Sequence, residues 1–149
     1  MIEQWRATAG ALLQQAYVAM ADVIDRWCEE LPSRRRLDPG RRGERTARRR
    51  LQRQGYIILA QNYRTAGAEI DLIALDGATL AFIEVKARAN AAAGTPREAV
   101  DYHKQQQLRR AAEAFVASRR LPALQARFDI VAILGAGRHR RIELIKDAF

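Results

Sequence analysis

Cysteine and histidine are scarce in this chain of 149 residues. The single cysteine, Cys28, excludes an internal disulfide and a CxxC pair and suits a reducing compartment, so we expect a cytoplasmic protein. The two histidines, His103 and His139, have no second His or Cys at ligand spacing, which argues against a zinc site. A Gly-rich phosphate loop and a Ser/His/Asp set are also missing, so the sequence gives no support for those two chemistries.

The chain also lacks a long apolar run. Residues 2–31 carry apolar side chains at intervals of three and four, from Trp5 to Leu31, which predicts a long amphipathic helix. A membrane span needs about 20 largely apolar residues, and polar residues interrupt this segment at Gln14, Gln15, Asp22 and Asp25. A secretory signal fits poorly because the first residues are not basic. We expect an extra N-terminal helix that packs on the domain, or one that binds a second copy or a protein partner.

Acidic residues are outnumbered, with 17 against 26 basic residues, a net charge of +9 and a pI near 10.7. Residues 1–31 contain two basic and five acidic residues, so residues 32–149 carry a net charge of +12. Such an excess attracts an anionic partner, for which nucleic acid and an acidic membrane surface both qualify. Phosphate binding would release counterions and weaken steeply as salt rises.

The basic character begins at residues 32–42, PSRRRLDPGRR, where two prolines, one glycine and five arginines predict a linker or a nucleic-acid arm. A short helix is expected over residues 43–54, and Gly55 is placed to end it. Glu44 and Leu51 share one stripe of that helix. Glu44 therefore either points inward with the apolar face or is an ordinary first-turn acid, favoured there by the helix dipole.

The remaining segments predict strands and one more helix. Strands are expected over residues 56–63, 127–134 and 141–145, a β-hairpin over 68–88, and a helix with a Thr95 capping box over 95–119. This order of elements predicts an α/β domain over residues 43–149, with a mixed sheet whose apolar faces are covered by helices. Asp129, on a strand that reads as buried, is expected to form an internal ion pair rather than to bind a ligand.

The hairpin over residues 68–88 carries the candidate site. A two-residue turn at Asp76-Gly77 is favoured because this dipeptide tolerates positive φ. That turn would place Asp71 opposite Phe82 and Glu84 opposite Glu69. Asp71 and Glu84 would then be diagonal neighbours, roughly 7–8 Å apart at the backbone.

Side chains alternate along a strand, so Asp71, Glu84 and Lys86 share one face of the hairpin while the opposite face is wholly apolar. A turn longer by two residues preserves this arrangement, and a three-residue loop destroys it. Two carboxylates suit Mg²⁺, which takes further ligands from water and substrate phosphate, and a lysine beside it can hold the attacking water. The alternative is a solvated face with a Glu84–Lys86 ion pair worth about 0–1 kcal/mol.

An ordered set of motifs over residues 42–149 resembles the YraN family. The matching segments are RGE at 42–44, GYIIL at 55–59, NYR at 62–64, AEIDLIA at 68–74, FIEVKAR at 82–88, PREAV at 96–100, Lys104, RFDIV at 127–131 and DAF at 147–149. These small bacterial proteins are placed in the restriction-endonuclease-like superfamily, whose core motif is PD-(D/E)xK and which includes archaeal Holliday-junction resolvases. One departure is Ala68, where the family pattern has Gly, and it bears on how closely the backbone approaches the site.

The resemblance implies a restriction-endonuclease-like fold and a nuclease that hydrolyses phosphodiester bonds in DNA, with branched, repair or recombination intermediates as candidate substrates. It implies Mg²⁺ or Mn²⁺ as cofactor. Asp71 and Glu84 would be metal ligands, the carbonyl of Val85 would add a ligand, and Lys86 would be the catalytic lysine. Glu44 would be the acidic residue of the first helix and would support a second ion or its waters.

The resemblance also implies that Lys104 borders the site, although the residue on its own reads equally well as part of a solvated basic face. We expect Arg45, Arg48, Arg88 and Lys104 to contact nucleic acid. Two other interpretations remain open. In the first, the protein is a nucleic-acid-binding module of the same fold that catalyses no reaction. In the second, it is an adapter that binds a protein partner through residues 1–31.

Overall fold

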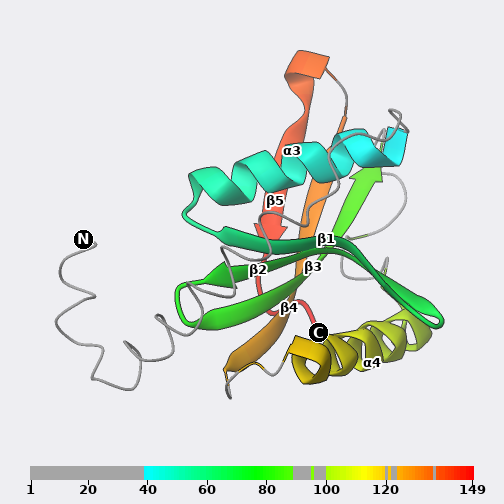
Figure 1. Ribbon diagram of the computed structural model, residues 1–149. Helices are drawn as coiled ribbons and strands as arrows, with labels where there is room; N and C mark the ends of the chain where they lie inside the picture. Colours follow the sequence, from blue (N-terminus) through cyan, green and yellow to red (C-terminus); the bar gives the residue numbers. More distant parts are fainter. Residues whose placement is uncertain (1–38, 89–94, 96–99, 120, 122–123, 136) are drawn as a thin grey trace, which may run out of the picture. The chain divides into compact units, whose positions relative to one another are not determined.

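The computed structural model describes residues 39–88, 95, 100–119, 121, 124–135 and 137–149 (Figure 1). The chain divides into two units, residues 1–33 and 34–149, and all the described residues lie in the second. The helix expected over residues 2–31 and the linker as far as residue 38 therefore lie outside the described residues. Within the described segments, no helix is long and apolar enough to cross a membrane.

A five-stranded mixed sheet forms the centre of this domain (Figure 1). Its strands lie side by side in sequence order: β1 (Ile57–Thr65), β2 (Ala68–Asp76), β3 (Thr79–Arg88), β4 (Gln125–Leu134) and β5 (Arg141–Ile145). β3 and β4 are parallel, and the other neighbours are antiparallel. A parallel pair needs a crossover connection, and this one contains α4 (Tyr102–Arg119). The predicted α/β fold with a mixed sheet and flanking helices is confirmed.

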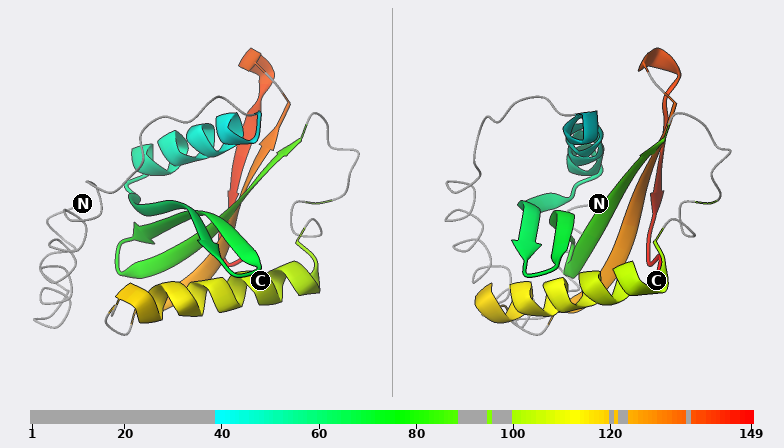
Figure 2. Two further views of the ribbon diagram at one scale, coloured as in Figure 1. Left: turned by 45° about the vertical axis from the view of Figure 1, so that its right-hand side comes forward. Right: turned by 90° about the vertical axis from the view of Figure 1, so that its right-hand side faces the viewer.

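The two helices cover opposite faces of the sheet, because neighbouring side chains on β3 point in opposite directions. Ile83 belongs to an apolar cluster that contains Ala47 and Leu51 of α3 (Pro39–Arg53). Phe82, the preceding residue, meets Phe115 of α4 edge to face, with ring centroids 6.2 Å apart. Figure 2 shows the two helices separated by the strands. The apolar face predicted for the hairpin is therefore covered by α3, and the face that carries the charged residues meets α4.

The β2–β3 hairpin forms as expected, but its turn lies one residue later than predicted. Asp76 pairs with Thr79, so the loop is Gly77-Ala78 rather than Asp76-Gly77. Gly77 has φ +60, and glycine at the first central position is typical of a type II′ hairpin turn. Asp76 consequently remains the last residue of β2.

This turn moves the pairing register by two residues. Ile73 lies opposite Phe82, so the predicted pairings of Asp71 with Phe82 and of Glu84 with Glu69 were wrong. A shift of two residues returns each side chain to the same face of the sheet. The shared face of Asp71 and Glu84 therefore survives the correction, and the two residues come closer together than the diagonal arrangement predicted.

Both helices begin at residues other than those predicted. α3 begins at Pro39, so residues 39–42 of the expected linker are helical, with proline in the first turn where its missing N–H is tolerated. It ends at Arg53, and Gly55 follows with φ +90, as expected. α4 begins at Tyr102, later than the expected start at residue 95, and Asp101 provides its cap; residues 96–99 of the expected capping box lie outside the described residues. The Oδ1 atom of Asp101 accepts the backbone N–H of Lys104 at 2.8 Å.

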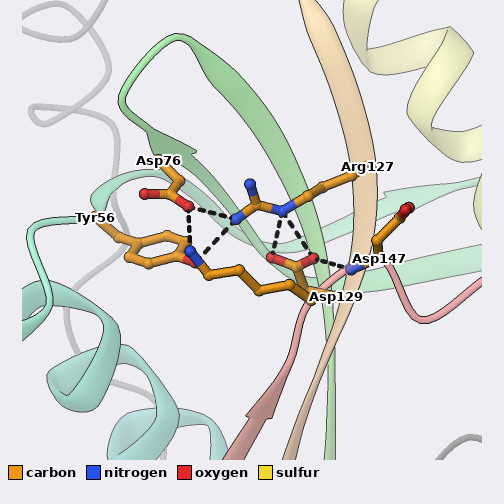
Figure 3. A network of polar contacts seen from close by, with 6 residues as sticks. Tyr56, Asp76, Arg127, Asp129 and Asp147 are labelled. Carbon is orange, nitrogen blue, oxygen red and sulfur yellow. Dashed lines mark hydrogen bonds and ion pairs between the residues drawn. The ribbon is translucent and has the colours of Figure 1, made fainter.

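A network of charged groups ties the β2–β3 turn to β4 and to the last residues of the chain (Figure 3). The Nε of Arg127 donates to both carboxylate oxygens of Asp129, at 2.9 and 3.0 Å, and its guanidinium also donates to Asp76 at 2.6 Å. The backbone N–H of Asp147 donates to Asp129 at 2.9 Å, and Lys146 donates to Asp76 at 2.7 Å. Asp129 is completely buried, and its predicted internal ion pair is confirmed.

Candidate active site

Three polar residues occupy one row across β1, β2 and β3. The β1–β2 register pairs the residues on either side of Asn62 with those on either side of Asp71, so these two lie across from each other. The β2–β3 ladder ends at Leu72 with Ile83, and the next step along both strands leads to Asp71 and Glu84. The register itself therefore gathers a carboxamide and two carboxylates at one place on the sheet.

Asp71 lies where β2 and β3 stop pairing, and its side chain, rather than its backbone, accepts a hydrogen bond from β3. Its Oδ2 accepts the N–H of Val85 at 2.7 Å. Burial, followed by the nearby charge of Glu84, raises the pKa of Asp71 to about 7, although the hydrogen bond from the Val85 N–H acts to lower it. Smaller contributions come from Glu44, which raises this pKa, and from Lys104, which lowers it. Asp71 is thus held close to two other acids.

Glu84 is the most buried of these acids, with a side chain only 7% exposed. Its Oε1 accepts a hydrogen bond from Lys86 Nζ at 2.8 Å and forms a longer ion pair with Lys104 Nζ at 3.6 Å. Its Oε2 is buried and has no hydrogen-bond partner in the described part of the chain. A buried carboxylate oxygen without a partner is costly. Oxygens of this kind are the preferred ligands of hard divalent cations.

Glu44 reaches this place from the first half of α3. The helix packs closely on β3 at Gly43, where an added Cβ would lie 3.3 Å from the Cβ of Ala87. The Oε2 of Glu44 accepts a hydrogen bond from the Nδ2 of Asn62 at 2.7 Å. The glycine permits the close approach, and the carboxamide then fixes the carboxylate.

The predicted nucleic-acid contacts lie at different places around these acids. Lys104 of α4 lies beside Glu84, and Arg48 is half-buried with its Nη1 3.5 Å from the side-chain oxygen of Gln61 on β1. Arg88 is half-buried at the end of β3, and Arg45 is exposed on α3. Of the four, Lys104 contacts an acid of the site, through its ion pair with Glu84.

The structure brings together Asp71, Glu84, Lys86 and Lys104 and places Glu44 near Asp71. Asn62 was not predicted as a site residue. Its signal in the sequence was an asparagine inside a segment patterned as a strand, where this residue type is depleted.

The donor set fits Mg²⁺ or Mn²⁺ better than a metal held entirely by protein. Across the described residues, no three His, Cys, Asp or Glu side chains gather closely enough to hold an ion by themselves. Mg²⁺ characteristically binds one or two carboxylates and completes its shell with water and substrate phosphates. Asp71 and Glu84 supply such a pair, and the unpartnered Glu84 oxygen is an open ligand atom.

Comparison with known proteins supplies relatives of uncharacterised function. Residues 43–133 match the model of the uncharacterised protein family UPF0102. A UPF0102 protein of Desulfosudis oleivorans is 44% identical over 110 residues, covering 74% of this chain and 88% of its own. A UPF0102 protein of Chlorobium phaeobacteroides is 46% identical over 118 residues, covering 75% of this chain and 94% of its own. The matched region contains every acid and lysine of the cluster described above.

Proposed function

This chain belongs to the uncharacterised protein family UPF0102, also known as the YraN family, and from this premise we propose that it is a metal-dependent endonuclease acting on DNA. The supporting observation is the meeting of Asp71, Glu84 and Lys86, with one buried Glu84 oxygen left unpartnered. The helix, β-hairpin and parallel β3–β4 pair agree with a restriction-endonuclease-like core, to which we assign the domain.

Each residue of the cluster has a definite task in this proposal. Asp71 and Glu84 would hold Mg²⁺ or Mn²⁺, with the carbonyl of Val85 as a further ligand. The ion, when bound, supplies charge stabilisation at the phosphoryl oxygens and lowers the pKa of a bound water. Lys86 Nζ, which donates to Glu84 Oε1, lies where it can orient the attacking water or donate to the developing negative charge. Glu44, held by Asn62, would support the waters of the ion or a second ion.

The nucleic acid would be held by cationic side chains beside the acids. Lys104 already lies against Glu84, and Arg45 and Arg48 of α3 and Arg88 of β3 would add further positive charge. The net charge of +12 on residues 32–149 provides the long-range attraction for phosphates. Binding should therefore weaken as salt rises, because bound counterions are released from the nucleic acid.

The experiment compares cleavage by the full chain in Mg²⁺, in Mn²⁺ and in chelator on linear, branched and single-stranded DNA. Wild type should cut only with the metal, and Glu84→Gln and Lys86→Met should each abolish cutting. Glu113→Gln is the matched control, because Glu113 is an exposed acid on α4. If wild type and Glu84→Gln are equally inert on every substrate, the protein is not a nuclease.

A second candidate function is a nucleic-acid-binding module of this fold without chemistry. The observation that favours it is the lack of three metal-ligating side chains close together among the described residues, next to a strongly basic composition. It predicts salt-sensitive binding of DNA that Glu84→Gln leaves unchanged. It also predicts that calorimetry detects no Mn²⁺ binding to the wild-type protein.

A further inference from the structure

Asn62 has a backbone conformation that a strand does not need. Its φ is +50, in the left-handed region, although it lies inside β1. The register of β1 also shifts between Ile58 and Ala60, just before this residue. Bulges re-aim side chains, and left-handed non-glycine residues persist where the surrounding structure holds them in place. Strand pairing alone therefore does not account for the backbone conformation of Asn62.

The left-handed backbone of Asn62 lets its side chain contact α3. The Nδ2 of Asn62 donates to Glu44 Oε2 at 2.7 Å, which joins β1 to α3. Asn62 also lies across from Asp71, in the row that continues to Glu84. The carboxamide therefore orients Glu44, whose charge acts on Asp71.

The choice of a neutral donor is informative. A lysine or arginine at this position would fix Glu44 equally well, but its charge would cancel part of the negative potential of the cluster. An amide hydrogen bond orients a carboxylate without neutralising it. Glu44 and Asp71 therefore keep their negative potential on the side of the cluster away from Lys86 and Lys104, which pair with Glu84, and a divalent cation would be attracted there.

We propose that Asn62 is a positioning residue: it holds the Glu44 carboxylate on the side of Asp71, where Glu44 binds the waters of a divalent cation that Asp71 and Glu84 ligate. This inference rests on the proposed function, because it assigns Asn62 a role at the same metal site. It extends the site to a residue of β1, and it explains the left-handed conformation there.

A glycine substitution separates this role from a purely structural one. Glycine adopts positive φ without steric cost, so Asn62→Gly preserves the path of the backbone and relieves its strain. If Asn62 served only to shape β1, glycine would replace it without loss. If its carboxamide positions Glu44, glycine leaves the fold intact and removes the hydrogen bond that orients the carboxylate.

The experiment uses the full chain and four variants: Asn62→Gly, Glu44→Ala, the double variant, and Arg64→Gln as a control on the same strand. Arg64 is exposed and pairs with Glu69 on the surface. Four quantities are measured: the Kd for Mn²⁺ by calorimetry, kcat and KM for DNA cleavage, and the urea midpoint. We expect Asn62→Gly to weaken Mn²⁺ binding and to lower kcat, each by about 10- to 100-fold, with the urea midpoint unchanged or higher.

The double variant decides whether the effect passes through Glu44. Its Kd and kcat should match those of Glu44→Ala alone, because a carboxylate that is absent needs no positioning. Wild-type affinity and kcat in Asn62→Gly would overturn the inference while leaving the proposed function in place, and so would losses that add up in the double variant. If wild type neither binds Mn²⁺ nor cuts DNA, the proposed function fails and the inference falls with it.

Discussion

Replacing Asp71 by asparagine should stabilise the metal-free protein at neutral pH while abolishing its metal binding. Burial and the neighbouring charge of Glu84 raise the pKa of Asp71 from 3.8 to about 7. The fold therefore disfavours the ionised form of this carboxyl group. Asparagine has nearly the same shape, carries no charge, and its Oδ1 can still accept the Val85 N–H that Asp71 accepts at 2.7 Å.

The size of the effect follows from the two pKa values. Each pH unit between them is worth about 1.4 kcal/mol, so ionisation of Asp71 lowers the free energy of unfolding by up to ~4 kcal/mol. The carboxyl group is partly accessible to water, and solvent screening reduces this to about 2–4 kcal/mol. The penalty is absent below pH 3.8, grows as the pH rises toward 7, and is constant above that. The stability difference between Asp71→Asn and wild type should therefore be near zero at pH 4 and largest at pH 8.

Urea unfolding followed by circular dichroism at several pH values, in chelator, measures this difference. Glu69→Gln is the matched control, because Glu69 lies on the same strand and pairs with the exposed Arg64. It should show no comparable gain at neutral pH. Added Mn²⁺ should stabilise wild type by about 2.7 kcal/mol at 100 times the Kd and leave Asp71→Asn unchanged. Parallel pH profiles for wild type and Asp71→Asn, or a variant that is less stable at pH 8, would refute the reasoning.

Three further predictions concern the fold, and each is checked by urea unfolding at pH 7. Arg127→Met should lower the free energy of unfolding by about 3–5 kcal/mol, because it removes the ion-pair partner of the buried Asp129 carboxylate. Adding Asp129→Asn should recover part of this loss, and a double variant as unstable as Arg127→Met would contradict the prediction. Asp101→Ala should cost about 1 kcal/mol through loss of the α4 cap, whereas Asp101→Asn should be nearly neutral. Deleting Phe149 should cost about 1–2 kcal/mol, because its ring stacks on Phe128 with centroids 5.1 Å apart; an unchanged midpoint would show that this contact contributes nothing.

Much of the architecture could be predicted because the strands of this protein are strongly patterned. The alternation along residues 68–88 identified both strands of the hairpin and both of its faces. The turn was misplaced because Asp76-Gly77 and Gly77-Ala78 are both acceptable two-residue loops. The second places glycine first and leaves Asp76 free to receive Arg127, a partner 51 residues away that no local pattern reveals.

The start of α4 was misplaced for a related reason. Thr95 begins a capping-box pattern, and the cap at Asp101, which accepts the N–H of Lys104, is an equally sound local signal that was not chosen. The candidate site was predictable as far as its charged residues, since Asp71, Glu84 and Lys86 share a face whenever the turn has an even length. Asn62 was missed because its role depends on a backbone conformation, φ +50, and on the meeting of β1 with α3.

The parallel pairing of β3 with β4 has a consequence during synthesis on the ribosome. A nascent chain that has emerged as far as Arg88 already contains Asp71, Glu84 and Lys86, but the outer edge of β3 stays unpaired until Gln125–Leu134 has been translated. An open strand edge is a template for association with other chains. Truncated products would expose this edge, so they should aggregate or be degraded.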